Sequence, residues 1–238
     1  MKIEILYPEL CDLFGDMGNT DYLRASLPEA EFIRTGLTET PRFASEQVDL
    51  LYLGSATERA QELMLQRLLP LRERLKALVE AGTVMLLTGN ACELFAEAIE
   101  TEDGREIPAL GLISGRAKRH IPQRFNSLYL GKFGETDIVG YTSRFSHLSG
   151  LPAENALFTT VKGLGPDPDA KSEGFRLNNV FGTYLLGPLL VLNPDFTAYL
   201  MRLLGAASSE PAFYAEAKQA FEIRLEEYRG DIGFGFHA

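Results

Sequence analysis

Short apolar runs alternate with a helical pattern in the first half of the chain. Residues 2–7, 48–54 and 84–88 are apolar runs bounded by Pro, Gly or polar residues, which is typical of buried strands. Between the second and third runs, apolar residues recur at steps of three and four and build one helical face: Met64, Leu68, Leu71, Leu75 and Leu78. The alternation predicts a three-layer α/β fold with a mostly parallel central sheet.

The second half of the chain has a different texture. Residues 126–130, 136–142 and 175–186 alternate apolar and polar positions between glycine-containing turns, which predicts antiparallel strands added to the parallel sheet. A helix is predicted after Asn193, which has N-cap character and is followed by Pro194. No repeat, low-complexity tract or linker divides the sequence, so we expect a single domain over residues 1–238.

One turn in the first half has the pattern of a reactive site. The apolar run 84–88 leads into Gly89 and Asn90, and a helix is predicted over residues 92–99 with Asn90 and Glu93 capping it. A strand, a sharp turn and a helix in this order form a nucleophile elbow in some enzymes. The same order also occurs at ordinary turns of doubly wound folds, and local pattern alone leaves both interpretations open.

Charge and composition exclude several classes of function. The net charge is −10, whereas a nucleic-acid surface needs clustered Lys and Arg, so no nucleic-acid partner is expected. No apolar run approaches the ~20 residues of a membrane span. The two cysteines and the lack of a signal-peptide pattern favour a reduced, cytoplasmic protein. His120, His147 and His237 have no metal-ligand spacing, so no metal or other cofactor is expected.

Several short motifs occur in an order and spacing that resembles a known family. The most specific are Gly15-Asp-Met-Gly-Asn19 and Gly182-Thr-Tyr-Leu-Leu-Gly-Pro188, supported by residues 49–54 and by Glu173-Gly174. The chain resembles the class I glutamine amidotransferase domains of the CobB/CobQ type, which have a flavodoxin-like α/β fold. Within that family it is most similar to GatD-type subunits, the glutaminase subunits of lipid II isoglutaminyl synthase.

The resemblance implies a chemistry that needs three groups. A cysteine thiolate at the elbow attacks the side-chain amide of glutamine, a histidine shuttles the proton, and backbone N–H groups hold the oxyanion. By this resemblance the nucleophile falls on Gly89, or on Thr88 after a shift of one residue, and the histidine falls on Leu186. Only the first glycine of the oxyanion loop is kept, at Gly54.

We therefore predict a degenerate pocket that contains no catalytic residue. Its predicted members are Gly54, Ser55, Thr88, Gly89, Asn90, Arg144 and Leu186. If the chemistry has moved instead, Cys92 and His147 are the fallback pair. The competing interpretation is that Cys92 packs as a small apolar residue.

Three functions follow from these observations. The favoured one is a glutamine amidotransferase-like subunit that does not hydrolyse glutamine and that supports or regulates a Mur-ligase-like, MurT-type synthetase in cell-wall precursor modification, with a glutamine-like small ligand in its pocket. The second is an active amidotransferase that uses Cys92 and feeds ammonia to a synthetase acting on a cell-wall precursor or, as in cobalamin biosynthesis, on a corrin-like carboxylate. The third is a stand-alone small-molecule-binding α/β protein, because such sheets host many activities.

Overall fold

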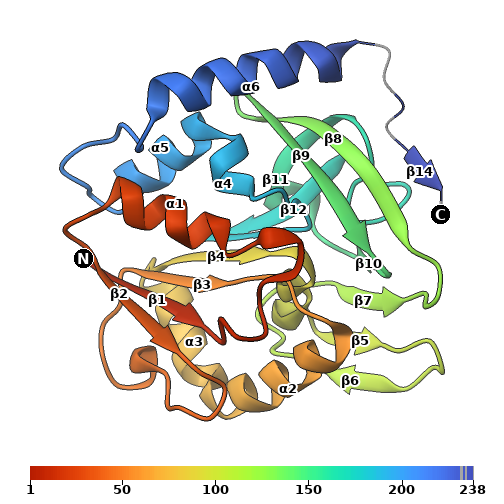
Figure 1. Ribbon diagram of the computed structural model, residues 1–238. Coiled ribbons are helices and arrows are strands. Elements are labelled where there is room, and N and C mark those ends of the chain that lie inside the picture. Colours follow the sequence, from red (N-terminus) through yellow and green to blue (C-terminus); the bar gives the residue numbers. More distant parts are fainter. Residues whose placement is uncertain (231–232, 234, 238) are drawn as a thin grey trace.

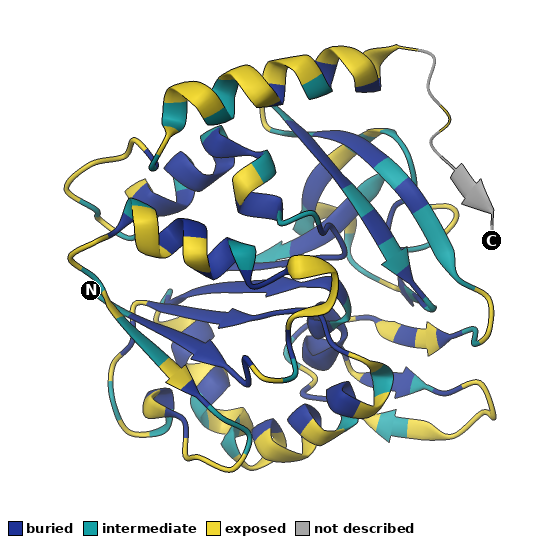
Figure 2. Cartoon of the chain, viewed as in Figure 1, coloured by how far each residue is buried: buried dark blue, intermediate teal, exposed yellow. Residues whose placement is uncertain are grey.

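Five parallel strands form one half of the larger sheet, with β2 at its edge (Figure 1). The computed structural model describes residues 1–230, 233 and 235–237. In sheet order the parallel strands are β2 (Glu31–Thr35), β1 (Lys2–Leu6), β3 (Leu50–Leu53), β4 (Val84–Thr88) and β13 (Val180–Thr183). The last three are buried along their whole length, as continuous apolar runs predict, because both faces of the sheet are covered (Figure 2).

Antiparallel strands extend this sheet beyond β13. They are β12 (Ser172–Leu177), β11 (Ala156–Lys162), β8 (Phe125–Phe133), β9 (Thr136–Arg144) and β14 (Gly235–His237). Strands β8 and β9 form a long hairpin that turns at Gly134, whose φ of +58° suits glycine. The predicted α/β fold, with a parallel centre and added antiparallel strands, is confirmed.

A smaller sheet lies beside the carboxyl ends of the parallel strands (Figure 1). Its strands are β10 (Ser146–Ser149), β7 (Arg116–Arg119), β5 (Ala98–Glu100) and β6 (Glu106–Pro108). Only Phe145 separates β9 from β10, so the chain passes from one sheet to the other at that residue. The junction places the end of β9 close to both sheets.

The predicted helix over residues 92–99 is wrong. The chain forms a short 3-10 helix, η4 (Gly89–Phe95), becomes extended at Ala96 and continues into β5. Ile99 pairs with Ala117 of β7 and is fully buried, so burial in a sheet accounts for the apolar residues that suggested a helix. Pairing with β7, which is distant in sequence, outweighs the local helical pattern.

The helices cover both faces of the larger sheet (Figure 1). One face carries α1 (Gly18–Ser26), α4 (Leu189–Leu192), α5 (Pro194–Leu203) and α6 (Tyr214–Arg229), and the other carries α2 (Glu58–Leu68) and α3 (Arg72–Glu80). Successive side chains of β3 point to opposite faces of the sheet. Tyr52 packs in the hydrophobic cluster that includes α1 and α5, and Leu51 packs in the cluster that includes α2 and α3. The remaining short 3-10 turns are η1 (Leu13–Gly15), η2 (Arg42–Ala44), η3 (Leu69–Leu71) and η5 (Ala153–Asn155).

Asn193 joins the helical layer to β9. It occupies the N-cap position of α5 with Pro194 behind it, but its side chain makes no cap hydrogen bond. Instead the Asn193 amide donates to the carbonyl oxygens of Val139 and Leu189, both at 2.8 Å, and accepts from the Val139 N–H at 2.9 Å. A buried side chain with these three bonds fixes α4 and α5 against the strand that leads to Arg144.

Replacing Asn193 by Ala is expected to lower the free energy of unfolding by about 3 kcal/mol. The cost arises because the Val139 N–H and C=O groups lose their buried partners, at about 1–3 kcal/mol for each unsatisfied group. Denaturant unfolding measures the change. Gln219→Ala on the exposed side of α6 is the matched control and should cost little. Equal stability of the two variants would contradict the bridging role.

Candidate functional site

A cavity of about 320 Å³ lies at the carboxyl ends of β3, β4 and β9. Ligands of open α/β sheets bind at this end of the strands, where successive strand-to-helix loops meet. The loop after β3, the elbow after β4 and the junction between β9 and β10 supply most of the wall. The lining residues are Leu13, Phe14, Ser55, Ala56, Thr57, Glu58, Gly89, Asn90, Arg124, Ser143, Arg144, Phe145, Ser146 and Leu186.

The structure brings most of the residues of the predicted pocket to this cavity. Ser55, Gly89, Asn90, Arg144 and Leu186 line it. Gly54 and Thr88 are the neighbours of lining residues in sequence and are buried. Asn90 was predicted to cap the helix after the elbow, but its side chain does not cap η4. Its side-chain amide instead bonds to both backbone groups of Ala56: the oxygen accepts from the N–H at 3.0 Å, and the nitrogen donates to the carbonyl at 2.8 Å. Asn90 thereby ties the elbow to the loop after β3.

Gly89 has the backbone of an elbow but no room for a side chain. Its φ is +58°, the left-handed conformation of a sharp strand-to-helix turn, whereas Thr88 is extended. A Cβ placed on Gly89 would lie 2.4 Å from Cβ of Ser55 and 3.3 Å from Cδ2 of Leu186. Carbon atoms in van der Waals contact are about 3.5–4.0 Å apart. Ser55 therefore excludes any nucleophilic side chain at position 89.

Leu186 closes the cavity from the β13 side. The residue lies beyond the end of β13 and forms an isolated bridge with Tyr141 of β9, in which the Leu186 N–H donates to the Tyr141 carbonyl at 2.9 Å. Its side chain is 1% exposed and faces the Gly89 backbone. A hydrocarbon at this point excludes water and provides no atom that accepts a proton.

Thr88 points away from the cavity into a buried polar network. Its hydroxyl donates to Oδ2 of Asp16 at 2.5 Å and lies 3.0 Å from the Tyr52 hydroxyl. The same Asp16 oxygen accepts the Ser55 N–H at 2.7 Å. Burial raises the pKa of Asp16 to about 6 against these hydrogen bonds, which lower it. The network fixes the loop after β3 and leaves Thr88 fully buried.

Cys92 and His147, the fallback pair, do not line the cavity. Cys92 is 1% exposed in the hydrophobic core, and burial, followed by the nearby Glu93 and Glu173, raises its pKa well above the ordinary value. A thiol held neutral in this way is a poor nucleophile. The His147 ring packs against Phe125 in a tilted arrangement, with 4.0 Å between the ring centroids, and burial lowers the pKa of His147 to about 4. The environment of Cys92 matches the alternative prediction of a small apolar packing residue.

Sequence reasoning missed the basic and aromatic residues at the mouth of the cavity. Arg124 precedes β8, donates to the Ser143 hydroxyl at 3.1 Å and lies over the ring of Phe145 at 4.2 Å. Phe14 has a left-handed backbone, with φ of +61°, and its ring meets Tyr141 edge-on at 6.1 Å. For Phe14, the only signal in the sequence was an aromatic residue within a glycine-rich loop. No sequence signal pointed to Arg124, because the pairing of β8 with β9 is what brings this residue to the cavity.

Arg144 is the most deeply buried charge in the wall of the cavity. Its guanidinium donates to the backbone carbonyls of Ser146 and Gly165 and, at 2.8 Å, to the Thr142 hydroxyl. It also lies 4.2 Å above the ring of Tyr184. These contacts hold a cation that is 5% exposed at the junction between the two sheets.

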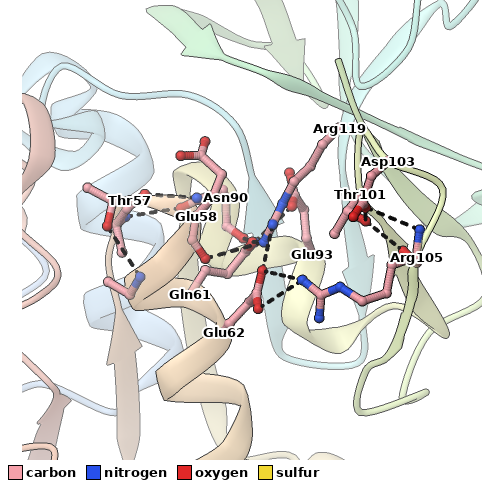
Figure 3. A network of polar contacts seen from close by, with 12 residues as sticks. Thr57, Glu58, Gln61, Glu62, Asn90, Glu93, Thr101, Asp103, Arg105 and Arg119 are labelled. Carbon is pink, nitrogen blue, oxygen red and sulfur yellow. Dashed lines mark hydrogen bonds and ion pairs between the residues drawn. The ribbon is translucent and has the colours of Figure 1, made fainter. Parts of the chain in front are cut away.

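A second buried network supports the wall from behind (Figure 3). Glu93 accepts hydrogen bonds from Tyr184 at 2.8 Å and from the Ser146 hydroxyl. It also accepts one from Gln61 at 2.8 Å, and these two residues are drawn in Figure 3. Gln61 in turn accepts from Arg119 of β7 at 3.0 Å. Burial raises the pKa of Glu93, and the hydrogen bonds oppose that shift. The network connects α2, η4 and the smaller sheet, which keeps the cavity preformed.

The described residues contain no group of three or more His, Cys, Asp and Glu side chains placed to hold a metal ion. Among the helices that the structure describes, none combines the length and the hydropathy needed to cross a membrane.

The pH dependence of stability should report on buried Glu173. Its carboxylate accepts from the Thr183 hydroxyl and, at 2.8 Å, from the Tyr184 N–H, and burial raises its pKa from 4.5 to about 7. The stabilisation due to the protonated carboxyl is fully present below 4.5 and is lost as pH rises through about 7. Glu173→Gln, which stays neutral, should therefore lose less unfolding free energy between about pH 5 and about pH 7.5 than the wild type, by up to about 3 kcal/mol.

Denaturant unfolding at the two pH values measures this difference. Glu222→Gln on the exposed side of α6 is the control and should keep the wild-type pH dependence. A Glu173→Gln profile parallel to the wild type would show that Glu173 does not titrate in this range.

Comparisons with known proteins agree with this architecture. A family model described as the CobB/CobQ-like glutamine amidotransferase domain matches residues 2–193. The lipid II isoglutaminyl synthase (glutamine-hydrolyzing) subunit GatD of Staphylococcus aureus (strain N315) is 25% identical over 220 residues, which cover 91% of this chain and 89% of the relative. The subunit of the same name from Streptococcus pneumoniae (strain ATCC BAA-255 / R6) is 22% identical over 206 residues, covering 84% of this chain and 79% of the relative.

Solved structures show the same fold at low identity. The structure of PurLQS from Thermotoga maritima has a TM-score of 0.54 at 12% identity and covers 94% of this chain and 98% of its own. A crystal structure of a glutamine amidotransferase has a TM-score of 0.56 at 14% identity, and the match covers 85% of this chain and 99% of that structure's chain. The predicted resemblance, including that to GatD, is confirmed. Since the family model spans most of the chain, the protein belongs to the CobB/CobQ-like glutamine amidotransferase family.

Proposed function

We propose that the chain is a GatD-like subunit that does not hydrolyse glutamine and that acts as the partner of a Mur-ligase-like synthetase. The observation that carries the proposal is the exclusion of a side chain at Gly89 by Ser55 and Leu186. Glutaminase chemistry needs a nucleophile at the elbow with a base within hydrogen-bond reach. Among the residues that the structure describes, neither a cysteine nor a histidine lines the cavity.

The burial of Cys92 argues against a rearranged active site. The sulfur of an attacking thiolate must reach the substrate, and Cys92 is 1% exposed beneath the elbow. Its raised pKa keeps the thiol protonated near neutral pH. The backbone is left-handed at the elbow, where φ of Gly89 is +58°, and φ of Gly187 before Pro188 is +140°.

A partner role is supported by the extent of the resemblance. The relatives are subunits by name, and this chain covers 89% and 79% of their length. The likeness therefore extends over most of the length of both relatives and is not confined to the region of the elbow. We therefore propose a MurT-type synthetase as the partner, within the modification of a cell-wall precursor.

Ammonia release from glutamine tests the missing activity. The chain alone, and the chain co-purified with a Mur-ligase-like synthetase, should release no more ammonia than a blank, and Cys92→Ala should not change the result. Removal of a working nucleophile usually costs several orders of magnitude in rate. Ammonia release that Cys92→Ala abolishes would overturn the proposal. Failure of the co-expressed synthetase to co-purify would overturn the partner role alone.

Opening the elbow should require two substitutions. Gly89→Cys alone is expected to lower the free energy of unfolding by about 1–3 kcal/mol, because its Cβ overlaps with Ser55. The double variant Ser55→Gly/Gly89→Cys should recover most of that loss. Because Cys11 and Cys92 are both buried, native-state alkylation by iodoacetamide should then label only residue 89.

Two controls complete the comparison. Ser55→Gly alone gives the cost of losing the hydrogen bond from its hydroxyl to the Leu13 carbonyl, and wild type gives the background labelling of the buried cysteines. A Gly89→Cys variant as stable as wild type would show that Ser55 does not close the elbow.

A further inference from the structure

Two helices on opposite faces of the larger sheet each carry a line of exposed residues at helical spacing. Figure 2 shows exposed residues along the outer side of both helices, α2 and α6. Residues three or four positions apart lie on one face of a helix. The α2 stripe consists of Arg59, Leu63, Gln66 and Arg67, and the α6 stripe consists of Glu216, Ala220, Ile223 and Glu227.

An exposed aliphatic side chain lies within each stripe. Leu63 is 39% exposed and Ile223 is 56% exposed, whereas Leu65 and Phe221 on the inner sides of the same helices are buried in the core. Complete burial of such a side chain is worth about 1.5–3 kcal/mol. Single exposed aliphatic residues are common on proteins, so the charges around these two decide what they can contact.

Positive charge flanks Leu63 on α2. Arg59 lies one helical turn before it and Arg67 lies one turn after it, and both are exposed. Among the ion pairs of the described residues, none includes either arginine. The nearby carboxylate of Glu62 is already paired with two arginines from the smaller sheet and its loop. The outer face of α2 therefore presents an apolar centre between two free positive charges.

Negative charge flanks Ile223 on α6. The basic residues of the helix do not cancel it, because Lys218 and Arg229 are paired within the chain and Arg224 is half-buried. The flanking glutamates are exposed and, within the part of the chain that the structure describes, take part in no ion pair. They are Glu216, two turns before Ile223, and Glu227, one turn after it.

The two stripes are complementary to each other and not to themselves. Two α2 stripes would bring arginines together, and two α6 stripes would bring glutamates together, both of which are unfavourable. An α2 stripe against an α6 stripe joins opposite charges around Leu63 and Ile223. Because α2 and α6 cover opposite faces of one sheet, the stripes of a single chain cannot meet (Figure 1). The contact therefore needs two copies.

We infer that the α6 stripe of one copy packs on the α2 stripe of a second copy. This contact is head-to-tail, so further copies add to a ring or an open chain instead of closing a symmetric dimer. One pair of helices buries less than the ~1,200 Å² of a stable interface, so the association is weak and rises with concentration. Self-association through these stripes does not depend on whether the cavity hydrolyses glutamine.

Sedimentation velocity on the intact chain tests the contact. The weight-average sedimentation coefficient should rise between about 10 μM and about 1 mM. Arg59→Glu/Arg67→Glu and Glu216→Arg/Glu227→Arg should each move this rise to at least about tenfold higher concentration, because like charges then face each other. An equimolar mixture of the two variants should recover the wild-type behaviour, since every contact between unlike copies again joins opposite charges.

A matched control separates the contact from the change in net charge. Arg24→Glu/Arg34→Glu, on α1 and β2, carries the same charge change on a different surface and should sediment as wild type. A coefficient that stays at the monomer value up to about 1 mM, or a mixture that does not recover, would overturn the inference. Loss of a co-purified synthetase in the Arg59→Glu/Arg67→Glu variant, with self-association unchanged, would overturn it as well and assign the α2 stripe to that partner.

Disulfide trapping gives a second measurement that uses different variants. Leu63→Cys and Ile223→Cys chains are mixed and oxidised with diamide, and the cross-linked peptides are identified by mass spectrometry. The native cysteines Cys11 and Cys92 are buried, so the introduced thiols should react. Links between positions 63 and 223 should make up most of the product. A share no larger than the half that random collision gives, or an excess of either position linked to itself, would contradict the head-to-tail contact.

Discussion

The contact between the loop after β3 and the elbow after β4 sets what this cavity can do. Backbone and Cβ atoms of Ser55 occupy the space into which a side chain at position 89 would project. The loop cannot easily retreat, because the Ser55 N–H is held by buried Asp16 and its neighbour Ala56 is held by Asn90. The steric exclusion is therefore anchored in polar networks that would cost free energy to break.

Those networks also explain how so many buried ionisable groups are tolerated. Asp16, Glu93 and Glu173 are each fully buried, and each accepts at least two hydrogen bonds. Burial raises the pKa of all three, and the hydrogen bonds that each carboxyl group accepts oppose that shift.

Sequence patterns predicted the parts of the structure that depend on nearest neighbours and strand ends. The apolar run of β4 and the turn at Gly89 were predicted correctly, and residues such as Ser55 and Leu186 meet because parallel strands end at one edge of a sheet. The helix predicted over residues 92–99 was wrong because pairing of Ile99 with β7 is a non-local event. Arg124 was missed because the register of β8 against β9, rather than its sequence neighbours, brings it to the cavity.

The wall of the cavity leaves no room for a side chain at the elbow, but it carries charged side chains such as Arg124 and Arg144. A site for amide hydrolysis spends its interactions on a transition state, and it needs a nucleophile, for which Ser55 leaves no room at position 89. A site for ligand binding needs only complementary charge, a rigid shape and dry walls, which Arg124, Arg144 and Phe14 supply. The rigidity that leaves no room for a side chain at Gly89 also lowers the cost of ordering the pocket around a ligand, so the closed elbow and a preorganised cavity have the same structural cause.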